Sequence, residues 1–329
     1  MRTTRTLLSC VNELGRALYV ILLLTWYSCG SNDISPIVDI PKPTIEDSVK
    51  VVYHPVIINV INAGNLSKSV ATGRKDSIEQ MKIIGSINGT DVKFIRTMAK
   101  LNYLDLSEAN FMNGGEYYYS YYCFLYYDNG NYNVYRYEYV YTLSETINEY
   151  TFFKYPGLRK IILPNSAISI GTAALYGCSN LESITIGDNI ETITNMTDNN
   201  GYSASNGWYA LGGCPCLKEV TVSSKNKYFK SINGVLYKGN NTIILFPPNK
   251  DSIYTIPSNV NYIYDRAFCD AVKMGKIYCL NPVPPKLGND VFKNVDKSKC
   301  ILFVPKGSSN AYSYTGQWGD FTKIVEIMQ

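Results

Sequence analysis

Residues 158–187, LRKIILPNSAISIGTAALYGCSNLESITIG, decide the fold because they hold one complete repeat and the start of the next. The frame L-x-x-I-x-L at Leu158 returns as L-x-x-I-x-I at Leu181 and as L-x-x-V-x-V at Leu217. The fourth and sixth positions of this frame share one face of an extended strand. The frame therefore predicts a short strand, buried on one side, that recurs along the chain.

Two further frames, LNYLDL at Leu101 and MGKIYC at Met274, extend the pattern. Between strands runs a coil, ISIGTAALYGC at 168–178, which recurs in degraded form as WYALGGC at 208–214 and YIYDRAFC at 262–269. One such repeat cannot bury its apolar stripe alone, so neighbouring repeats must stack and the ends need caps. The interval before the third frame is longer than the others, and its excess, around NMTDNNGYSASNGW, predicts a surface loop.

Cysteine recurs at one position of the coil. Cys178 and Cys214 lie three residues before the leucine of the next frame, and Cys269 lies three residues before Val272. A residue that returns at one repeat position predicts a small buried side chain, with disulfide pairing as the alternative. Cys214 and Cys216 form a lone C-x-C without further ligands at zinc spacing, so we expect no metal site.

Both ends of the repeat array carry helix signals. At the front, Thr90 or Asp91 is the predicted N-cap of a short helix. At the back, SSNAYSYTG predicts a helical turn that begins at a serine and ends at Gly316. Two aromatic residues follow as a predicted apolar lid: Trp318 and Phe321.

Residues 116–142 hold twelve of the chain's 29 tyrosines. The sequence Asp128-Asn129-Gly130-Asn131 is a tight-turn signal, so the stretch predicts a β-hairpin inserted in the solenoid. Alternate residues of its second strand are tyrosines that share one face. Tyrosine brings contact area with little loss of rotamer freedom, which suits recognition or sugar stacking; cross-strand pairing that only stabilises the hairpin is the alternative. The predicted ligand-binding residues are Tyr135, Tyr137, Tyr139 and Tyr141.

The first 28 residues differ from the rest. Arginines precede an apolar run, ALYVILLL at 17–24, which is short for a bilayer span but typical of a signal peptide. The following TWYSCGSND, with Ser28 before Cys29, resembles the lipobox of bacterial lipoproteins, although Trp26 stands where Leu, Val or Ile is usual. The resemblance implies that the sulfur of Cys29 is diacylated and anchors the chain. Ordinary cleavage near Ser28, with release of a secreted protein, is the alternative.

The charge of the mature chain is nearly balanced. Without residues 1–28 it has 28 basic and 26 acidic side chains, and no run of lysine and arginine. This composition argues against nucleic acid or an anionic membrane face as the partner. Residues 29–48 are rich in Pro, Ser and Asp without periodicity, so they predict a spacer.

Catalytic signatures are missing from the sequence. It has no G-x-S-x-G, H-E-x-x-H, Walker loop or G-x-G-x-x-G, and its single histidine, His54, has no companion for a triad. A glycosidase needs only carboxylates, but the acidic residues are scattered and none returns at the same register of the repeat. We therefore expect no enzyme, no catalytic residue and no cofactor.

The repeat resembles the leucine-rich repeats of BspA-like surface lipoproteins of the Bacteroides type. The segment containing INGVLYK resembles the family's "DGVLY" hairpin, with Asn233 where Asp is common, and Ala174-Leu175 stands where the family has Ala-Phe. This resemblance implies a mainly β leucine-rich repeat solenoid with short helical turns, N- and C-terminal caps and β-hairpin insertions. The segments that carry it outside the repeats are 63–70, 83–111, 227–250, 281–294 and 301–321.

The expected organisation has five parts and one insertion. They are the signal peptide 1–28, a spacer 29–48, an N-terminal α/β cap region 49–100, the solenoid 101–280 with the hairpin 116–142, and a C-terminal capping segment 281–329.

We expect a non-catalytic binding or adhesion protein of the cell surface, which recognises a host or bacterial surface protein or a glycan. A structural or accessory lipoprotein of a surface assembly is the alternative. The expected location is the outer membrane, lipid-anchored and surface-exposed, or else secreted. Three D-S-V/I tripeptides resemble the O-glycosylation signal of Bacteroides-type exported proteins; two of the serines are alternatively plain helix or turn starts. The candidate acceptors are Ser48, Ser77 and Ser252.

Overall fold

The computed structural model describes residues 54–71, 73–125, 134–194 and 209–327, with backbone only for 122–125 and 134–136. All of these residues belong to the second of the two units into which the chain divides, Ser48–Gln329. Several predicted features lie outside the described residues. They are the signal peptide, Cys29, the spacer, Ser48, the turn at 128–131, the loop at 195–208 and the side chain of Tyr135.

A six-stranded parallel sheet runs through the first half of the unit. Frame residues form its ladder, because Leu104 pairs with Ile161, Ile161 with Ile184, and Ile184 with Val220. All four are fully buried, and burial of each such side chain contributes about 1.5 to 3 kcal/mol before entropy is counted. The predicted repeat strand is thus confirmed. In sheet order the strands are β1 (Val56–Val60), β2 (Gln80–Ile87), β3 (Tyr103–Phe111), β7 (Lys160–Ile162), β9 (Ser183–Ile186) and β11 (Glu219–Val222).

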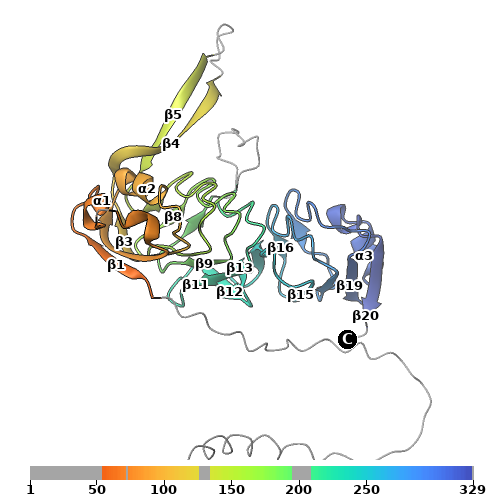
Figure 1. The fold of residues 1–329 in the computed structure, drawn as a ribbon. Helices are drawn as coiled ribbons and strands as arrows, with labels where there is room; N and C mark the ends of the chain where they lie inside the picture. The colour runs from red at the N-terminus through yellow and green to blue at the C-terminus, as the bar shows by residue number, and fades with distance from the viewer. Residues whose placement is uncertain (1–53, 72, 126–133, 195–208, 328–329) are drawn as a thin grey trace, which may run out of the picture. The chain divides into compact units, whose positions relative to one another are not determined.

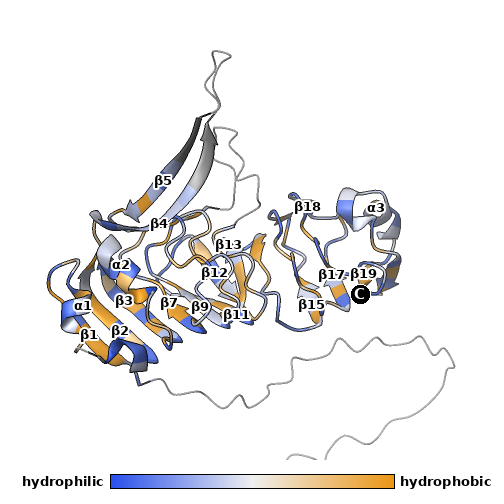
Figure 2. Ribbon diagram, turned by 45° about the horizontal axis from the view of Figure 1, so that its top comes forward, coloured by the Kyte–Doolittle hydropathy of each residue, from blue (hydrophilic) through white to orange (hydrophobic). Residues whose placement is uncertain are grey.

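The sheet also includes strands that precede the first frame. β1 and β2 pair in parallel, and β2 pairs with β3, so residues before Leu101 continue the same sheet. Figure 2 shows β1, β2, β3 and β7 side by side with hydrophobic stretches in register. The front of the solenoid is therefore one sheet with the repeats that follow it.

Short strands form a second wall of each coil. β6 (Thr146–Ile147), β8 (Ser169–Ile170) and β10 (Thr192–Ile193) pair in parallel, in the order β10-β8-β6. The hydroxyl of Ser169 donates to that of Thr146, 23 residues earlier, at 3.2 Å. The coil pitch is thus about 23 residues here, whereas the inserted loop raises the next separation to 36 residues, as between Ser183 and Glu219.

Four of the coils then turn through a five-residue segment with left-handed backbone at its first and fifth positions. The pairs with positive φ are Tyr150 and Lys154, Ala173 and Gly177, Arg266 and Asp270, and Asp290 and Asn294. The third residue donates to the second residue of the next coil, as from Phe152 N to Ala174 O at 2.7 Å. This backbone ladder fixes the repeat register independently of the side chains.

The predicted hairpin at residues 227–250 is confirmed and divides the core. β12 (Phe229–Ile232) and β13 (Val235–Lys238) are joined by Asn233 and Gly234, both with positive φ, as a type I′ turn requires. β13 then pairs with β14 (Thr242–Leu245). Leu236 packs in the core of the first half, and Tyr237 in that of the second. The hairpin therefore contributes one face to each core.

The second half repeats the architecture with its own sheets. The frame at Met274 is confirmed, since Ile277 and Cys279 lie on a strand and are fully buried. One parallel sheet has the order β15 (Ile253–Ile256), β17 (Lys276–Cys279), β19 (Ile301–Pro305) and β20 (Lys323–Ile327). The short strands β16 (Tyr262–Ile263) and β18 (Lys286–Leu287) follow β14 in the other sheet.

The predicted N-cap of the front helix is wrong by two or three residues. α2 (Gly89–Ile95) is capped by Asn88, whose side-chain oxygen accepts from Thr90 N at 3.1 Å. Asp91 is the third helical residue, and its carboxylate closes a capping box on the backbone of Asn88. The short helices α1 (Leu66–Ser69) and η1 (Lys75–Ser77) precede α2.

At the rear cap the predicted lid is confirmed, but the predicted end of the helix is wrong. α3 (Ser309–Ser313) follows Ser308, as the predicted serine start requires, but it ends before Tyr314. Gly316 does not end this helix; it begins η2 (Gly316–Trp318). Trp318 and Phe321 are buried and cover the last coil, which confirms the lid.

The prediction that the recurring cysteine is buried is wrong at one of its three positions. Cys178 and Cys214 are buried, as predicted, and the cysteines whose side chains are described are free thiols. Cys269, however, is half-buried. Asp270, with φ of 62°, occupies the position of Gly177, so the buried position after it belongs to Ala271. Cys269 therefore stands one step before the left-handed residue, where the side chain points away from the core.

Candidate functional site: the tyrosine hairpin and a pocket at the core junction

The tyrosine-rich insertion is an antiparallel hairpin of β4 (Gly114–Leu125) and β5 (Val134–Thr142). Figure 1 shows the hairpin projecting away from the coils. Its register pairs Tyr121 with Glu138 and Ser120 with Tyr139. The predicted hairpin is thus present, and it leaves the solenoid at the end of the first frame strand.

A large bulge at the base of β4 breaks its regular alternation. Gly114 pairs with Thr142 and Tyr119 with Val140, so four residues of β4 face the single residue Tyr141. Consecutive residues Tyr118 and Tyr119 consequently both contact the solenoid, where a regular strand would turn one of them outward.

These inward tyrosines anchor the hairpin. The hydroxyl of Tyr118 donates to Glu149 O at 2.8 Å, and burial raises the pKa of Tyr118. The ring of Tyr119 stacks on Tyr150 with centroids 4.6 Å apart. Val140 completes this inner face and is 3% exposed. The base of the hairpin is therefore fixed to the coil that follows it.

The opposite face of β5 is open to solvent. Tyr137, Tyr139 and Tyr141 are 61%, 50% and 44% exposed. Tyr117 of β4 joins them at 42% exposure, with its ring centroid 4.8 Å from Tyr139 and 6.4 Å from Tyr141. We call these four residues the tyrosine row. The predicted Tyr135 continues the same strand, but its side chain lies outside the described residues.

Sequence reasoning missed Tyr117. A regular hairpin gives no reason to place it beside Tyr139 and Tyr141, because its position depends on the bulge. Its ring also lies under Lys93 of α2, whose Nζ is 5.2 Å from the ring centroid and 2.6 Å from Glu116 Oε2. The contact with Glu116 raises the pKa of Lys93, so a cation borders the row at its base.

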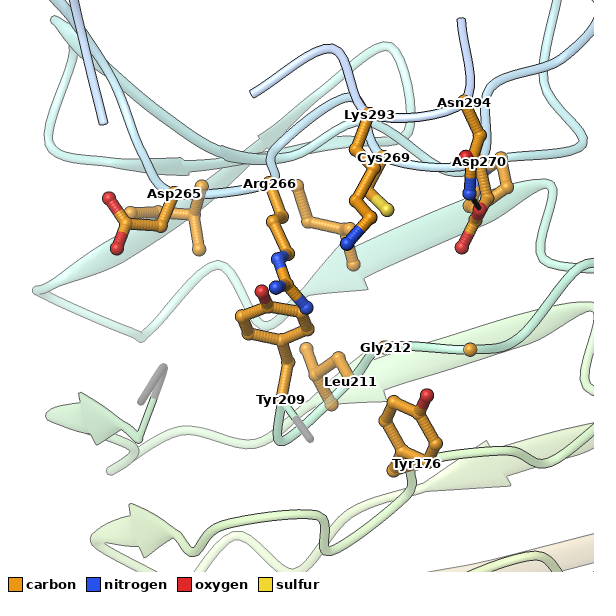
Figure 3. A pocket seen from close by; sticks show the side chains of 14 residues that line it. Tyr176, Tyr209, Leu211, Gly212, Asp265, Arg266, Cys269, Asp270, Lys293 and Asn294 are labelled. Carbon is orange, nitrogen blue, oxygen red and sulfur yellow. Dashed lines mark hydrogen bonds between the residues drawn. The ribbon is translucent and has the colours of Figure 1, made fainter. Parts of the chain in front are cut away.

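A second candidate site lies where the two cores meet. A cavity of about 230 Å³ opens between Tyr176, Tyr209 and Gly212 on one side and Arg266, Cys269 and Asp270 on the other. Figure 3 shows the guanidinium of Arg266 above the ring of Tyr209, with Cys269 and Lys293 directed toward the same space. The lining residues come from five successive coils. Only the degraded copies WYALGGC and YIYDRAFC hint at this site in the sequence.

Electrostatic pairs border the cavity. Arg266 lies 4.5 Å from the centroid of Tyr209 and 3.1 Å from a carboxylate oxygen of Asp290. Asn294 Nδ2 donates to Asp270 Oδ1 at 2.6 Å. Burial, reinforced by Asp270, raises the pKa of the Cys269 thiol to about 12. The thiol is therefore protonated at neutral pH, which disfavours nucleophilic chemistry at this cysteine.

The remaining predicted sites have separate places. Ser77 ends η1, with its hydroxyl donating to Arg74 O at 2.9 Å, and Ser252 is exposed just before β15. His54 is exposed, and its backbone N donates to Gln80 Oε1 at 2.8 Å. In the described ranges, no group of three or more His, Cys, Asp or Glu side chains could hold a metal ion. No helix there has the length and apolarity needed to cross a membrane.

Several solved structures are similar to this chain, among them the following three. A leucine-rich repeat protein from Eubacterium ventriosum is 18% identical, with a TM-score of 0.33, and the match covers 56% of this chain and 58% of that one. The pneumococcal vaccine antigen PcpA is 18% identical, with a TM-score of 0.38 and coverage of 78% and 52%. A leucine rich cell surface protein from Faecalibacterium prausnitzii is 13% identical, with a TM-score of 0.37 and coverage of 78% and 61%. The chain thus spans between about half and three fifths of those proteins.

Curated protein sequences gave no match. The repeat itself does match a known family. Six copies of the BspA type leucine rich repeat region align with residues 139–233 and 245–316. These ranges hold more than half of the 329 residues. They include β7, β9, β11, β15, β17 and β19 and the four pairs of left-handed turn residues. The chain therefore belongs to the BspA-type leucine-rich repeat family.

Proposed function

We propose that this protein is a non-catalytic binding protein of the cell surface, whose tyrosine row is its recognition surface. The observation that carries the proposal is the exposure of Tyr117, Tyr137, Tyr139 and Tyr141 on one face of a hairpin anchored by its other face. Exposed aromatic rows of this kind are uncommon on surfaces that bind nothing. The partner is a host or bacterial surface protein, or a glycan.

Tyrosine is well suited to this role. Its ring offers a large contact area with only two side-chain torsions to fix, and its hydroxyl supplies a hydrogen bond. Residues that dominate binding energy are enriched in tyrosine. Edge-on contacts of Tyr117 with Tyr139 and Tyr141 hold the rings in place before a partner arrives, which reduces the ordering cost of binding.

The alternative is a structural or accessory lipoprotein without a ligand of its own. Such a protein would present a polar surface of mixed charge at this position. Instead, the outer face of β5 carries three aromatic side chains at least 44% exposed, so the observations favour recognition.

We call the replacement of Tyr137, Tyr139 and Tyr141 of the tyrosine row, together with Tyr135 of the same strand, by serine the row variant, and we expect it to abolish ligand capture. A few residues dominate the binding energy of an interface, and tyrosine is enriched among them; truncating one such residue costs about 2 kcal/mol or more, which is roughly a thirtyfold loss of affinity. The measurement is binding to an array of immobilised glycans and a panel of host-matrix and bacterial surface proteins. Circular dichroism should show an unchanged fold, because the outer face contributes little to the core.

The matched control replaces exposed tyrosines elsewhere. Tyr228 and Tyr314 are 41% and 89% exposed and lie outside the hairpin, so changing both to serine should leave capture intact. If the variant of the tyrosine row binds the panel as the natural chain does, the proposed recognition surface is wrong.

We also propose that Cys29 carries the lipid anchor, which places the folded unit at the outer membrane and facing outward. The Cys29→Ala variant is expected to move from the membrane fraction to the medium, because it loses the acyl chains that give stable anchoring. Cell fractionation and incorporation of labelled palmitate measure this. Palmitate that is still incorporated into the variant would refute the assignment.

We propose that the candidate serines carry O-linked sugars. Ser77 and Ser252 are both on the surface of the described unit, which makes their hydroxyls accessible to a transferase. Ser48 would carry its sugar in the predicted spacer.

A further inference from the structure

The backbone ladder between coils is interrupted beside the pocket. In the first half, Leu175 N donates to Ala210 O at 2.8 Å and Gly177 N to Gly212 O at 3.0 Å. Leu211 and Gly213 are the next donors in this register. Neither amide has a backbone acceptor among the described residues. Two polar hydrogens at the edge of the pocket are therefore available to a ligand.

The coil that should accept these hydrogen bonds has an altered sequence. Its equivalent segment is ILFPP at 244–248, since Phe246 N donates to Ala267 O at 2.7 Å, as Phe268 N does to Val291 O at 3.0 Å. The β12–β13 hairpin precedes this segment, and two prolines end it. Two consecutive prolines restrict the backbone here, and the segment accepts no backbone hydrogen bond from Leu211 or Gly213.

The absence of a side chain at Gly212 lets two aromatic rings line the cavity. The fourth position of the turning segment points outward and holds Tyr176 in one coil, Gly212 in the next and Cys269 in a later one. A Cβ built on Gly212 would lie 2.9 Å from the ring of Tyr209 and 3.3 Å from that of Tyr176. The two aromatic rings thus occupy the space beside the glycine and form one wall of the cavity.

The lining combines aromatic surface with balanced charge. Tyr209 is held under Arg266, whose guanidinium is also paired with Asp290. The charged groups on the lining are two carboxylates, Asp265 and Asp270, and two cations, Arg266 and Lys293. A phosphate or carboxylate ligand needs an excess of positive charge, and this lining has none.

We propose that the cavity binds one neutral pyranose ring of a glycan. The apolar face of a sugar ring packs on tyrosine, while its hydroxyls both donate and accept hydrogen bonds. Here Asp270 can accept, and the amides of Leu211 and Gly213 can donate. A volume of about 230 Å³ is below the range of roughly 300 to 1,000 Å³ for drug-sized ligands, which fits a single ring.

An extended peptide is a less suitable occupant. A strand added at this edge would bond to Leu211 and Gly213 on one side, but on the other side it would meet Pro248, which cannot donate. This sugar site is separate from the tyrosine row and does not depend on it.

The test is saturation-transfer NMR of the full chain with neutral hexoses and N-acetylhexosamines, alongside a hexose phosphate and an unrelated decapeptide. We expect at least one neutral sugar to bind. Tyr209→Ala should weaken its binding about tenfold or more, the loss that follows from removing about 1.4 kcal/mol of contact. Asp270→Asn, which keeps a residue tolerant of left-handed backbone, should also weaken it.

Two controls separate this site from the tyrosine row. Tyr314→Ala, 89% exposed and outside the lining, and the serine variant of the row should both bind the sugar as the natural chain does. The proposal is overturned if no neutral sugar binds, if only the hexose phosphate or the peptide binds, or if Tyr209→Ala and Asp270→Asn leave sugar binding unchanged. Loss of sugar binding in the row variant alone would place the sugar on the hairpin and also overturn it.

Discussion

Trp318→Ala is expected to lower the free energy of unfolding by about 3 to 5 kcal/mol, the range for removing a large buried aromatic side chain. Trp318 is fully buried, with its ring centroid 5.1 Å from Phe292 and 5.4 Å from Tyr312. Its Nε1 donates to Pro285 O at 2.9 Å. The substitution therefore opens a cavity in the lid and leaves a buried carbonyl without its donor.

Denaturant unfolding followed by far-ultraviolet circular dichroism measures this loss. Because each coil is stabilised by its neighbours, hydrogen exchange of β19 and β20 should rise before that of the first half. Tyr314→Ala, at an 89% exposed position between α3 and η2, is the control and should change stability by less than about 0.5 kcal/mol. A loss below about 1 kcal/mol for Trp318→Ala would show that the lid does not stabilise the last coil.

At the front of the solenoid, Asp91→Ala is expected to lower the free energy of unfolding by about 3 kcal/mol or more. The carboxylate is 1% exposed and accepts three backbone hydrogen bonds, from Gly64 N at 2.5 Å, Leu66 N at 2.8 Å and Asn88 N at 2.9 Å. Each buried donor that loses its acceptor costs about 1 to 3 kcal/mol. Asp91→Asn should lower the free energy of unfolding by less than Asp91→Ala does, because it keeps one acceptor oxygen.

Asp76→Ala is the matched control for this site. Its side chain is 67% exposed, with an ion pair to Lys75 at 3.9 Å, and exposed pairs of this kind contribute little. The same denaturant series measures all three variants. Equal stability of Asp91→Ala and Asp76→Ala would contradict the role assigned to Asp91.

The repeat could be predicted from the sequence because its physics is local. Ile161 and Leu163 lie on one face of an extended segment, and the same spacing returns at Ile184 and Ile186 with both side chains buried. The INGVLYK hairpin was equally visible, since the Asn-Gly pair defines its turn.

Features set by long-range contacts were not predictable in the same way. The residues next to Asp91 predict that it is an N-cap. Its carboxylate, however, also accepts hydrogen bonds from backbone amides 25 and 27 residues earlier, at Leu66 and Gly64. A helix end alone does not reveal these partners. Similarly, Cys269 matches Cys178 by its distance to an apolar residue, whereas the left-handed residues of the ladder assign that position to Ala271.

The candidate site was predicted in part. Alternation along β5 placed Tyr137, Tyr139 and Tyr141 on one face, and the structure leaves that face exposed. The bulge in β4 that adds Tyr117 to them begins at Gly114 and Gly115, both with positive φ. The glycine pair marks a bulge in the sequence, but it does not give the length of the bulge. The pocket beside Gly212 depends on a hydrogen-bond ladder that is broken by the next coil, so only the folded arrangement reveals it.

Recognition by the tyrosine row is tested most directly by a footprint of the bound partner. The protein is treated with tetranitromethane, which nitrates exposed tyrosines, with and without the partner captured in the panel, and the modified positions are mapped by mass spectrometry. We predict that the partner protects Tyr137, Tyr139 and Tyr141, while the exposed Tyr228 and Tyr314 are nitrated equally in both states. Unchanged nitration of the row in the presence of a bound partner would contradict the account.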